Sequence, residues 1–198
     1  MRTLRQRRNT PPRFRLPLTM AQAAAALLDA YSGEVDRRSR TLVQDDSTLA
    51  NIDALATFLT SDSPKFGVML CGTPGNGKTT LARSLAVVIN SYNLIPMTII
   101  NARDIAYYSQ NAGFINDISD AGKLAIDDLG MEPTEVVEYG NVLNPIIDLI
   151  EYRYLRQLFT LVTTNLTAEQ IRKKYGNRIA DRFNEMLEVI VFRNQSYR

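Results

Sequence analysis

The sequence contains no histidine, no tryptophan and a single cysteine, Cys71. One thiol cannot form an intramolecular disulfide framework, and a zinc site would lack its usual histidine and cysteine ligands. Such sparing use of cysteine is typical of a reducing compartment, so we expect a cytoplasmic protein.

Long apolar runs are also absent. No stretch approaches the length of a membrane-spanning helix, so we expect no association with a membrane. The positively charged start, MRTLRQRRNTPPRFRLP, has no apolar segment behind it and is therefore unlike a secretory signal. The composition, 45% hydrophobic and 22% charged, is that of a globular protein, and 198 residues suit one domain with an additional arm.

Positive charge is concentrated at the N-terminus, although the net charge of the chain is only +2. The arginines that precede the first acidic residue, Asp29, are Arg2, Arg5, Arg7, Arg8, Arg13 and Arg15. A basic arm on a mildly acidic body favours an anionic partner such as nucleic acid, or a partner protein; a solvated tail is the alternative. Residues 1–18 contain three prolines, which predicts an extended or disordered arm.

Beyond the arm, the sequence predicts alternating helices and strands. Helices are expected over 19–40 and after a cap at Asp46 or Ser47. Strands are expected at 66–72, 97–101, 123–128, 158–165 and 188–192, and further helices at 78–93, 102–110, 136–157 (interrupted by Pro145), 167–176 and 177–187. This alternation predicts an α/β fold in which a five-stranded parallel sheet lies between helices.

The segment GTPGNGKT, residues 72–79, matches the pattern G-x-x-x-x-G-K-[ST] between a strand and a helix. Glycines let successive backbone N–H groups point at phosphate oxygens, and the following helix adds its positive N-terminal end. Lys78 would reach the β- and γ-phosphates, and the Thr79 hydroxyl would bind Mg²⁺. The predicted ATP-binding residues are Gly72, Thr73, Pro74, Gly75, Asn76, Gly77, Lys78, Thr79 and Thr80.

Two adjacent acids, Asp127 and Asp128, end the strand in KLAIDDLG. Open α/β sheets bind ligands at this edge, so Asp127 is expected to hold Mg²⁺ together with Thr79, and Asp128 to polarise the attacking water. The alternative is that these acids cap the next segment.

Polar residues later in the chain complete the predicted catalytic set. Asn165 ends the strand LFTLVTTN, where its amide would hold the attacking water or the γ-phosphate; capping the next helix, as Thr167 could also do, is the alternative. Arg178 and Arg182 share a helix face, and either they reach the nucleotide of a neighbouring subunit or they form ion pairs on a solvated helix.

Together, LCGTPGNGKTTLA, LAIDDLG, LVTTNL and YGNRIADRF…VIVFRNQSYR resemble an AAA+ ATPase, and more closely the DnaC-type helicase loaders and the IstB-type transposition ATPases. The resemblance covers residues 42–198, the expected ATPase domain, and leaves 1–41 as a basic arm and helix. It implies an AAA+ P-loop NTPase core without a full C-terminal lid. It also implies that Asn165 is sensor 1 and that Arg182, beside Arg178, is the arginine that acts in trans.

The resemblance further implies slow ATP hydrolysis stimulated by assembly or DNA, a homo-oligomer joined through the ATP interface, and a replicative helicase as partner. Residues 102–122 fall where loaders contact single-stranded DNA, so Arg103, Tyr107, Tyr108 and Phe114 are candidate DNA contacts; core and surface roles are the alternative. Two other functions stay open: an ATPase helper of a transposase, and a nucleotide-dependent scaffold with negligible hydrolysis. The scaffold alternative comes from Asp128, where AAA+ proteins usually have glutamate.

Overall fold

The computed structural model of the chain describes residues 13–43, 45–92, 94–133, 136–138, 141–194 and 196–197, with the backbone alone for 136–138 and 141–143. The helices are α1 (Met20–Asp36), α2 (Asp46–Thr60), α3 (Lys78–Ser91), α4 (Ala102–Tyr107), α5 (Ala112–Asp120), α6 (Pro145–Arg156) and α7 (Ala168–Met186). The strands are β1 (Gly67–Gly72), β2 (Thr98–Asn101), β3 (Lys123–Leu129), β4 (Val136–Glu138), β5 (Asn141–Leu143), β6 (Phe159–Thr164) and β7 (Leu187–Phe192).

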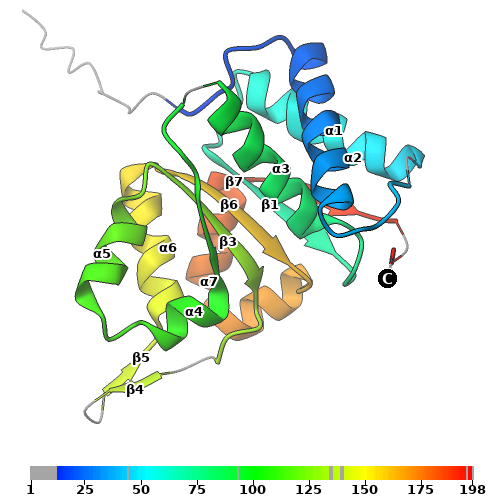
Figure 1. Ribbon diagram of the computed structural model, residues 1–198. Helices are drawn as coiled ribbons and strands as arrows, with labels where there is room; N and C mark the ends of the chain where they lie inside the picture. Colours follow the sequence, from blue (N-terminus) through cyan, green and yellow to red (C-terminus); the bar gives the residue numbers. More distant parts are fainter. Residues whose placement is uncertain are drawn as a thin grey trace, which may run out of the picture.

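Five strands form one parallel sheet in the order β2-β3-β6-β1-β7 (Figure 1), which confirms the predicted α/β class and the predicted sheet. The order places β6 between β3 and β1, so the C-terminal ends of these three strands meet in the middle of one sheet edge. Ligands of open α/β sheets bind at such an edge.

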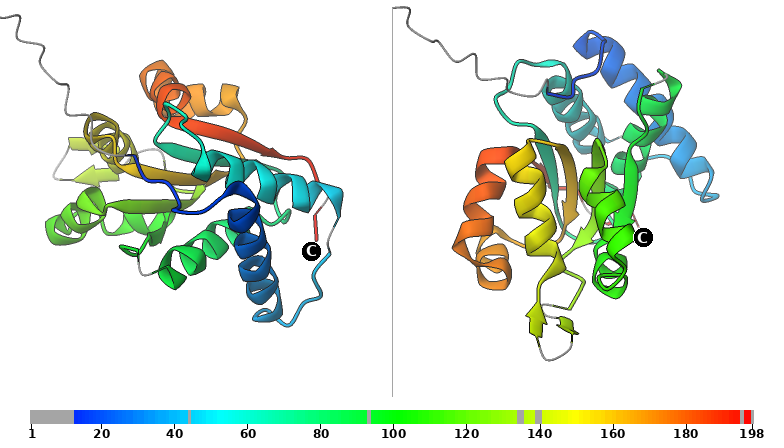
Figure 2. Two further views of the ribbon diagram at one scale, coloured as in Figure 1. Left: turned by 90° about the horizontal axis from the view of Figure 1, so that it is seen from above. Right: turned by 90° about the vertical axis from the view of Figure 1, so that its left-hand side faces the viewer.

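Helices cover both faces of the sheet: α1, α2 and α3 lie on one face, and α4 to α7 on the other (Figures 1 and 2). Successive side chains of β1 alternate between the two cores, because Val68 and Leu70 join the first core and Met69 joins the second. Each fully buried leucine in such a core stabilises the fold by about 2 kcal/mol.

Helix α1 belongs to the same core as the sheet. Ala23 and Leu27 are fully buried with Leu81 and Leu85 of α3. The predicted start at residue 19 is correct: the Thr19 hydroxyl accepts a hydrogen bond from the Gln22 backbone N–H, and the Gln22 side-chain oxygen accepts one from the Thr19 backbone N–H. Helix α1, which follows the basic arm, therefore packs directly on α3, the helix that follows the glycine-rich loop between β1 and α3.

The described part of the basic arm is also attached to the body. The Leu16 amide donates to the carbonyl of Leu59, 2.9 Å away, and the Leu16 side chain is buried. Arg15 donates to the carbonyls of Ser61, Ser63 and Lys65 at 2.6–3.0 Å. The guanidinium of Arg15 is thus engaged within the protein, while Arg2, Arg5, Arg7 and Arg8 lie outside the described residues.

The sequence prediction was wrong for the first part of residues 136–157. Instead of a helix, β4 and β5 form an antiparallel pair, and α6 begins only at Pro145. Proline is favoured in the first helical turn because its ring fixes φ and its missing N–H would have no partner there, and the Asn144 side chain caps the helix. The β-branched Val136 and Val137 favour strand over helix.

Two smaller predictions concerned helix ends. The cap of α2 is Asp45, which accepts from the Thr48 amide at 2.7 Å, and not Asp46 or Ser47. The two helices expected over 167–187 form α7, which is interrupted at Gly176 by a non-helical backbone with φ 84°.

No helix among the described residues is both long enough and apolar enough to cross a lipid bilayer.

Arg153 on α6 is a buried cation that joins three elements. Its side chain donates to the carbonyls of Ile118, Ser119, Ala121 and Phe159 and to the Thr160 hydroxyl at 2.6–3.2 Å. Burial lowers the pKa of Arg153 to about 10, an effect that the nearby charge of Asp120 partly offsets. The group therefore remains charged at neutral pH, with its donors directed at carbonyl oxygens.

We expect Arg153→Met to lower the free energy of unfolding by at least about 3 kcal/mol, because several buried carbonyls lose their donors. The exposed Arg156, which pairs with Asp120 at 3.5 Å, is the control: Arg156→Met should change stability by less than about 1 kcal/mol. Urea unfolding measures both, and similar losses in the two variants would contradict this role for Arg153.

Candidate functional site

The glycine-rich loop connects β1 to α3 and has an unusual backbone. Gly75 and Gly77 have φ of 84° and 96°, which side chains rarely adopt. A Cβ at Gly77 would also lie 2.2 Å from the Tyr31 hydroxyl, so both the backbone and the space around it require glycine. The loop curls and then enters α3 at Lys78, where the helix presents its positive N-terminal end.

Lys78 is buried inside this curl. Its ammonium donates to the carbonyls of Gly72 and Thr73 at 2.9 and 2.7 Å and to Asn76 Oδ1 at 3.0 Å. The loop therefore holds a positive charge next to backbone N–H groups, an arrangement whose chemistry suits phosphate.

The two acids predicted at the end of β3 lie at a shift in register between Ile126 and Leu129. Asp127 Oδ1 accepts from the Thr79 hydroxyl at 2.9 Å and from the Thr163 hydroxyl at 2.6 Å. The Asp128 amide donates to the same Thr163 hydroxyl at 2.9 Å. The predicted pair Thr79 and Asp127 is thus in direct contact, across 48 residues of sequence.

Asp128 has a left-handed backbone with φ 57°, which aspartate tolerates better than most residues. The irregularity of β3 at this point gives the two neighbouring carboxylates different surroundings. Asp127 is buried against Thr79 and Thr163, while Asp128 lines the cavity beside the glycine-rich loop. The strand β3 continues past both acids to Leu129.

Asn165 lines the same cavity from the end of β6. Its Oδ1 is buried and has no hydrogen-bond partner among the described residues. The alternative role as a helix cap belongs instead to Thr167, whose hydroxyl accepts from the Gln170 amide. A buried carbonyl oxygen without a donor is costly unless a ligand or water supplies one, which makes Asn165 a candidate ligand contact.

The cavity has a volume of about 830 Å³ and is lined by the glycine-rich loop, Asp128, Asn165 and the N-terminal segment. No pattern in the sequence indicates that the N-terminal segment lines the cavity, which it does with Tyr31, Val35, Arg38, Arg40, Thr41, Leu42 and Val43. The Arg38 guanidinium donates to the Thr80 hydroxyl at 3.1 Å. Burial, followed by the nearby Tyr197 and Asp45, raises the pKa of Tyr31 to about 12, so its hydroxyl stays protonated.

The residues after β7 hold the glycine-rich loop by hydrogen bonds that no sequence motif predicts. The Asn194 side chain donates to the carbonyl of Asn76 at 2.9 Å, and the Tyr197 amide donates to the carbonyl of Gly75 at 3.0 Å. The Tyr197 hydroxyl donates to Asp45 at 2.7 Å, so the tail also joins the loop to the start of α2.

Arg178 and Arg182 lie on α7 and both form ion pairs with Glu151 of α6; the Arg182 pair measures 2.8 Å. Arg182 also stacks over the Tyr154 ring, and its side chain is only 18% exposed, compared with 69% for Arg178. The structure does not bring these arginines to the cavity of their own chain, since neither lines it.

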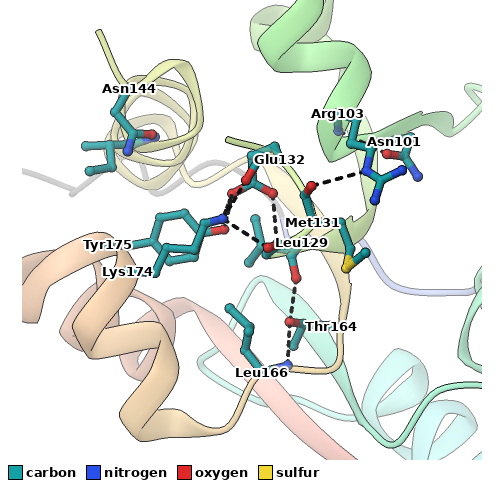
Figure 3. Close-up of polar contacts among 12 residues, drawn as sticks. Asn101, Arg103, Leu129, Met131, Glu132, Asn144, Thr164, Leu166, Lys174 and Tyr175 are labelled. Carbon is teal, nitrogen blue, oxygen red and sulfur yellow. Dashed lines mark hydrogen bonds and ion pairs between the residues drawn. The ribbon is translucent and has the colours of Figure 1, made fainter. Parts of the chain in front are cut away.

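The candidate DNA contacts lie on and after α4. Tyr107 and Tyr108 are 80% and 47% exposed, and Phe114, which is half-buried, packs against Tyr108. The backbone N–H of Arg103 donates to the Asn101 side chain, which caps α4. The Arg103 side chain donates from Nε to the carbonyl of Met131 at 3.1 Å (Figure 3). Met131 also lines the cavity, so this segment begins next to the candidate site.

Because Asn194 supports the loop without entering the cavity, we expect Asn194→Ala to raise the Kd for ADP about tenfold, or ~1.4 kcal/mol. Exposed Arg193, next to it in the tail, gives the control variant Arg193→Ala, which should stay within about twofold of the wild type. Calorimetric titration measures both affinities, and equal values for all three proteins would contradict the support role.

Several solved structures of known proteins are similar to this chain. The DnaC helicase loader shares 22% identity with a TM-score of 0.64 over 77% of this chain and 94% of its own. A putative primosome component from Streptococcus pyogenes serotype M3 shares 19% with a TM-score of 0.63 over 88% and 98%. The replication initiator DnaA bound to AMPPCP and single-stranded DNA shares 14% with a TM-score of 0.58 over 78% and 49%.

At these identities, the three solved structures establish similarity of fold alone. No curated protein matches the chain. The profile of the ATPase family associated with various cellular activities (AAA) matches residues 68–189, which is more than half of the sequence and contains the glycine-rich loop, both acids and Asn165. The chain therefore belongs to the AAA family of ATPases.

Proposed function

We propose that this protein hydrolyses ATP to control an assembly on DNA, as a helicase loader in DNA replication. The observation that carries the proposal is the convergence of Thr79 and Thr163 on one carboxylate oxygen of Asp127, beside a buried lysine. A hydroxyl and a carboxylate held together next to a phosphate-binding loop form the ligand set that Mg²⁺-nucleotide requires.

The described residues fit Mg²⁺ and ATP. The loop offers a backbone curl without room for a Cβ at Gly77, and Asn165 offers a buried acceptor that lacks a partner. Bound at Thr79 and Asp127, Mg²⁺ would neutralise charge on the β- and γ-phosphates. Lys78 contributes a second positive charge to the phosphates from inside the loop.

In the proposed reaction, Asp128 and Asn165 act on water. The carboxylate of Asp128 polarises the attacking water, and the amide of Asn165 fixes the direction from which the water approaches. Both side chains line the same cavity as the glycine-rich loop, which supports this division of roles. An aspartate reaches less far than the glutamate usual in AAA+ proteins, so we expect slow turnover.

The proposed assembly joins subunits through the nucleotide. Arg178 is the more accessible arginine of α7, and its contact with Glu151 is on the surface. An exposed ion pair costs little to break, so Arg178 is free to be recruited by the phosphates of a neighbouring subunit. Arg182 would have to leave both Glu151 and the Tyr154 ring, which makes it the less accessible of the two.

The proposed DNA surface consists of Arg103, Tyr107 and Tyr108. Two tyrosines, 80% and 47% exposed, lie close to an arginine and provide ring faces for base stacking and a charge for the nucleic-acid backbone. The similarity in fold to the DnaC helicase loader and to DnaA bound to single-stranded DNA supports a role in replication and a replicative helicase as the partner.

Phosphate release and ATP binding, measured for the wild type, Lys78→Ala and Asp128→Asn, test the catalytic proposal. The wild type should hydrolyse ATP slowly, with a rate per subunit that rises with protein concentration. Lys78→Ala should lose binding, and Asp128→Asn should bind ATP with turnover reduced at least about 100-fold. Equal, background-level release from all three would favour the scaffold alternative, and a wild type that does not bind Mg-ATP would contradict the proposal entirely.

Binding of a fluorescent oligo-dT tests the DNA surface. Tyr107→Ala should weaken binding by about 1–3 kcal/mol, the usual contribution of one stacked base. Tyr92, which is 43% exposed at the end of α3, gives the control variant Tyr92→Ala, for which no change is expected. Equal losses in both variants, or none in either, would remove DNA contact from α4.

A further inference from the structure

The segment that follows Asp128 is held by side chains from several elements. We call residues 128–132 the Asp128 loop. Two of its residues, Asp128 and Gly130, have positive φ, at 57° and 105°. A Cβ at Gly130 would lie 2.6 Å from the Leu166 side chain, so the loop packs tightly against the segment after β6. Such a conformation persists only where its surroundings fix it.

All five carbonyls of the Asp128 loop accept hydrogen bonds, and those of Leu129 and Met131 can be followed in Figure 3. The Asp128 carbonyl accepts from the Met131 amide at 3.1 Å, and the Leu129 carbonyl accepts from the Thr164 hydroxyl at 2.7 Å. The carbonyls of Gly130 and Glu132 accept from Lys174, and that of Met131 accepts from Arg103. Apart from the Met131 amide, which belongs to the loop itself, the donors come from β6, α7 and α4.

Glu132 closes this network with a buried carboxylate whose side chain is 2% exposed. It accepts from the Gly130 amide at 2.8 Å and from the Tyr175 hydroxyl, and it pairs with Lys174 at 3.3 Å. Burying a carboxylate is costly unless it is paired and hydrogen-bonded, and Glu132 meets both conditions. Its partners on α7, Lys174 and Tyr175, directly precede the break in that helix at Gly176.

The contacts of Glu132 lead to the candidate catalytic carboxylate in two steps. Glu132 holds the Gly130 amide, and the short turn from Asp128 to Met131 connects Gly130 to Asp128. The Asp128 amide is fixed in turn by Thr163, whose hydroxyl also contacts Asp127. A displacement of Lys174 and Tyr175 would therefore reach Asp128 through hydrogen bonds and covalent bonds alone.

We propose that Glu132, together with Lys174 and Tyr175, positions Asp128 and makes that position depend on α7. Glu132 is a positioning residue: it contacts Gly130, Lys174 and Tyr175 and acts on the reaction through Asp128. Helix α7 also carries Arg178 and Arg182, so engagement of this helix by a neighbouring subunit would change the placement of Asp128. The inference rests on the proposed ATPase function for its kinetic consequence.

The test uses Glu132→Gln, which preserves the shape of the side chain but removes its charge, and Tyr175→Phe, which removes one hydroxyl and leaves the ion pair. Tyr152→Phe is the matched control, because the Tyr152 hydroxyl also contacts a carboxylate, Asp120, but at an exposed site. We expect turnover to fall at least about tenfold in the first two variants, while the Kd for Mg-ATP stays within about twofold, the signature of a loss confined to the transition state. The control should match the wild type in both quantities.

Backbone NMR gives a second readout that needs no hydrolysis. The amide resonances of Asp128 and Gly130 should shift in Glu132→Gln and in Tyr175→Phe and remain unchanged in Tyr152→Phe. Unchanged Asp128 resonances would overturn the inference, as would turnover within about twofold of the wild type or a Kd that rises in proportion to the loss of turnover. A wild type without ATPase activity would overturn the proposed function, whereas the NMR shifts would still decide whether Glu132 positions Asp128.

Discussion

The structure of the site depends on one carboxylate oxygen, Oδ1 of Asp127, which accepts hydrogen bonds from the hydroxyls of two residues on elements that are distant in sequence. Thr79 approaches from the first turn of α3 and Thr163 from the last residues of β6. These two hydrogen bonds fix the glycine-rich loop, β6 and β3 relative to one another. The strand order β3-β6-β1 makes this possible, since it places the three strand ends side by side.

Around this point, the protein arranges polar groups that are complementary to an anion. A buried ammonium, the N-terminus of α3 and the amide oxygen of Asn165 all border one cavity. Asn165 directly follows β6, and its oxygen has no hydrogen-bond partner in the described part of the chain. The loop that carries the ammonium is shaped by glycines inside it and by Asn194 and Tyr197 outside it. The same tail contacts the cap of α2, so distant parts of the chain share in the geometry of one loop.

The sequence predicted those parts of the site that depend on local backbone patterns. The five strands and the glycine-rich loop follow from local patterns. The contact between Thr79 and Asp127 follows because Thr79 comes after the loop at the carboxyl end of β1 and Asp127 lies near the carboxyl end of β3, both strands of one parallel sheet. The sequence prediction was wrong for residues 136–138 and 141–143, because such short apolar stretches carry no reliable period and resemble an extension of the helical pattern after Pro145. The sequence left open whether Asn165 or Thr167 caps α7, because both precede the helix. The structure shows that the Thr167 side chain makes the capping hydrogen bond.

Other contributors could not be predicted, because their contacts join residues far apart in the chain. Tyr197 meets Gly75 and Asp45, and Glu132 meets Tyr175, without any motif that connects them. A single sequence marks such residues only as polar, and their burial appears with the fold. Arg153 is a similar case: nothing in its neighbourhood along the chain indicates a cation enclosed by carbonyls.

The close approach of the Tyr31 hydroxyl to Gly77 couples the N-terminal helix α1 to the glycine-rich loop. The hydroxyl of a residue on the N-terminal helix occupies the space where any larger residue at position 77 would place its first carbon. Leu27 and Ala23, on the same helix, are enclosed by α3 and its neighbours. Any residue larger than glycine at position 77 would therefore require the Tyr31 hydroxyl to move, so a displacement of α1 would be felt at the entrance to α3.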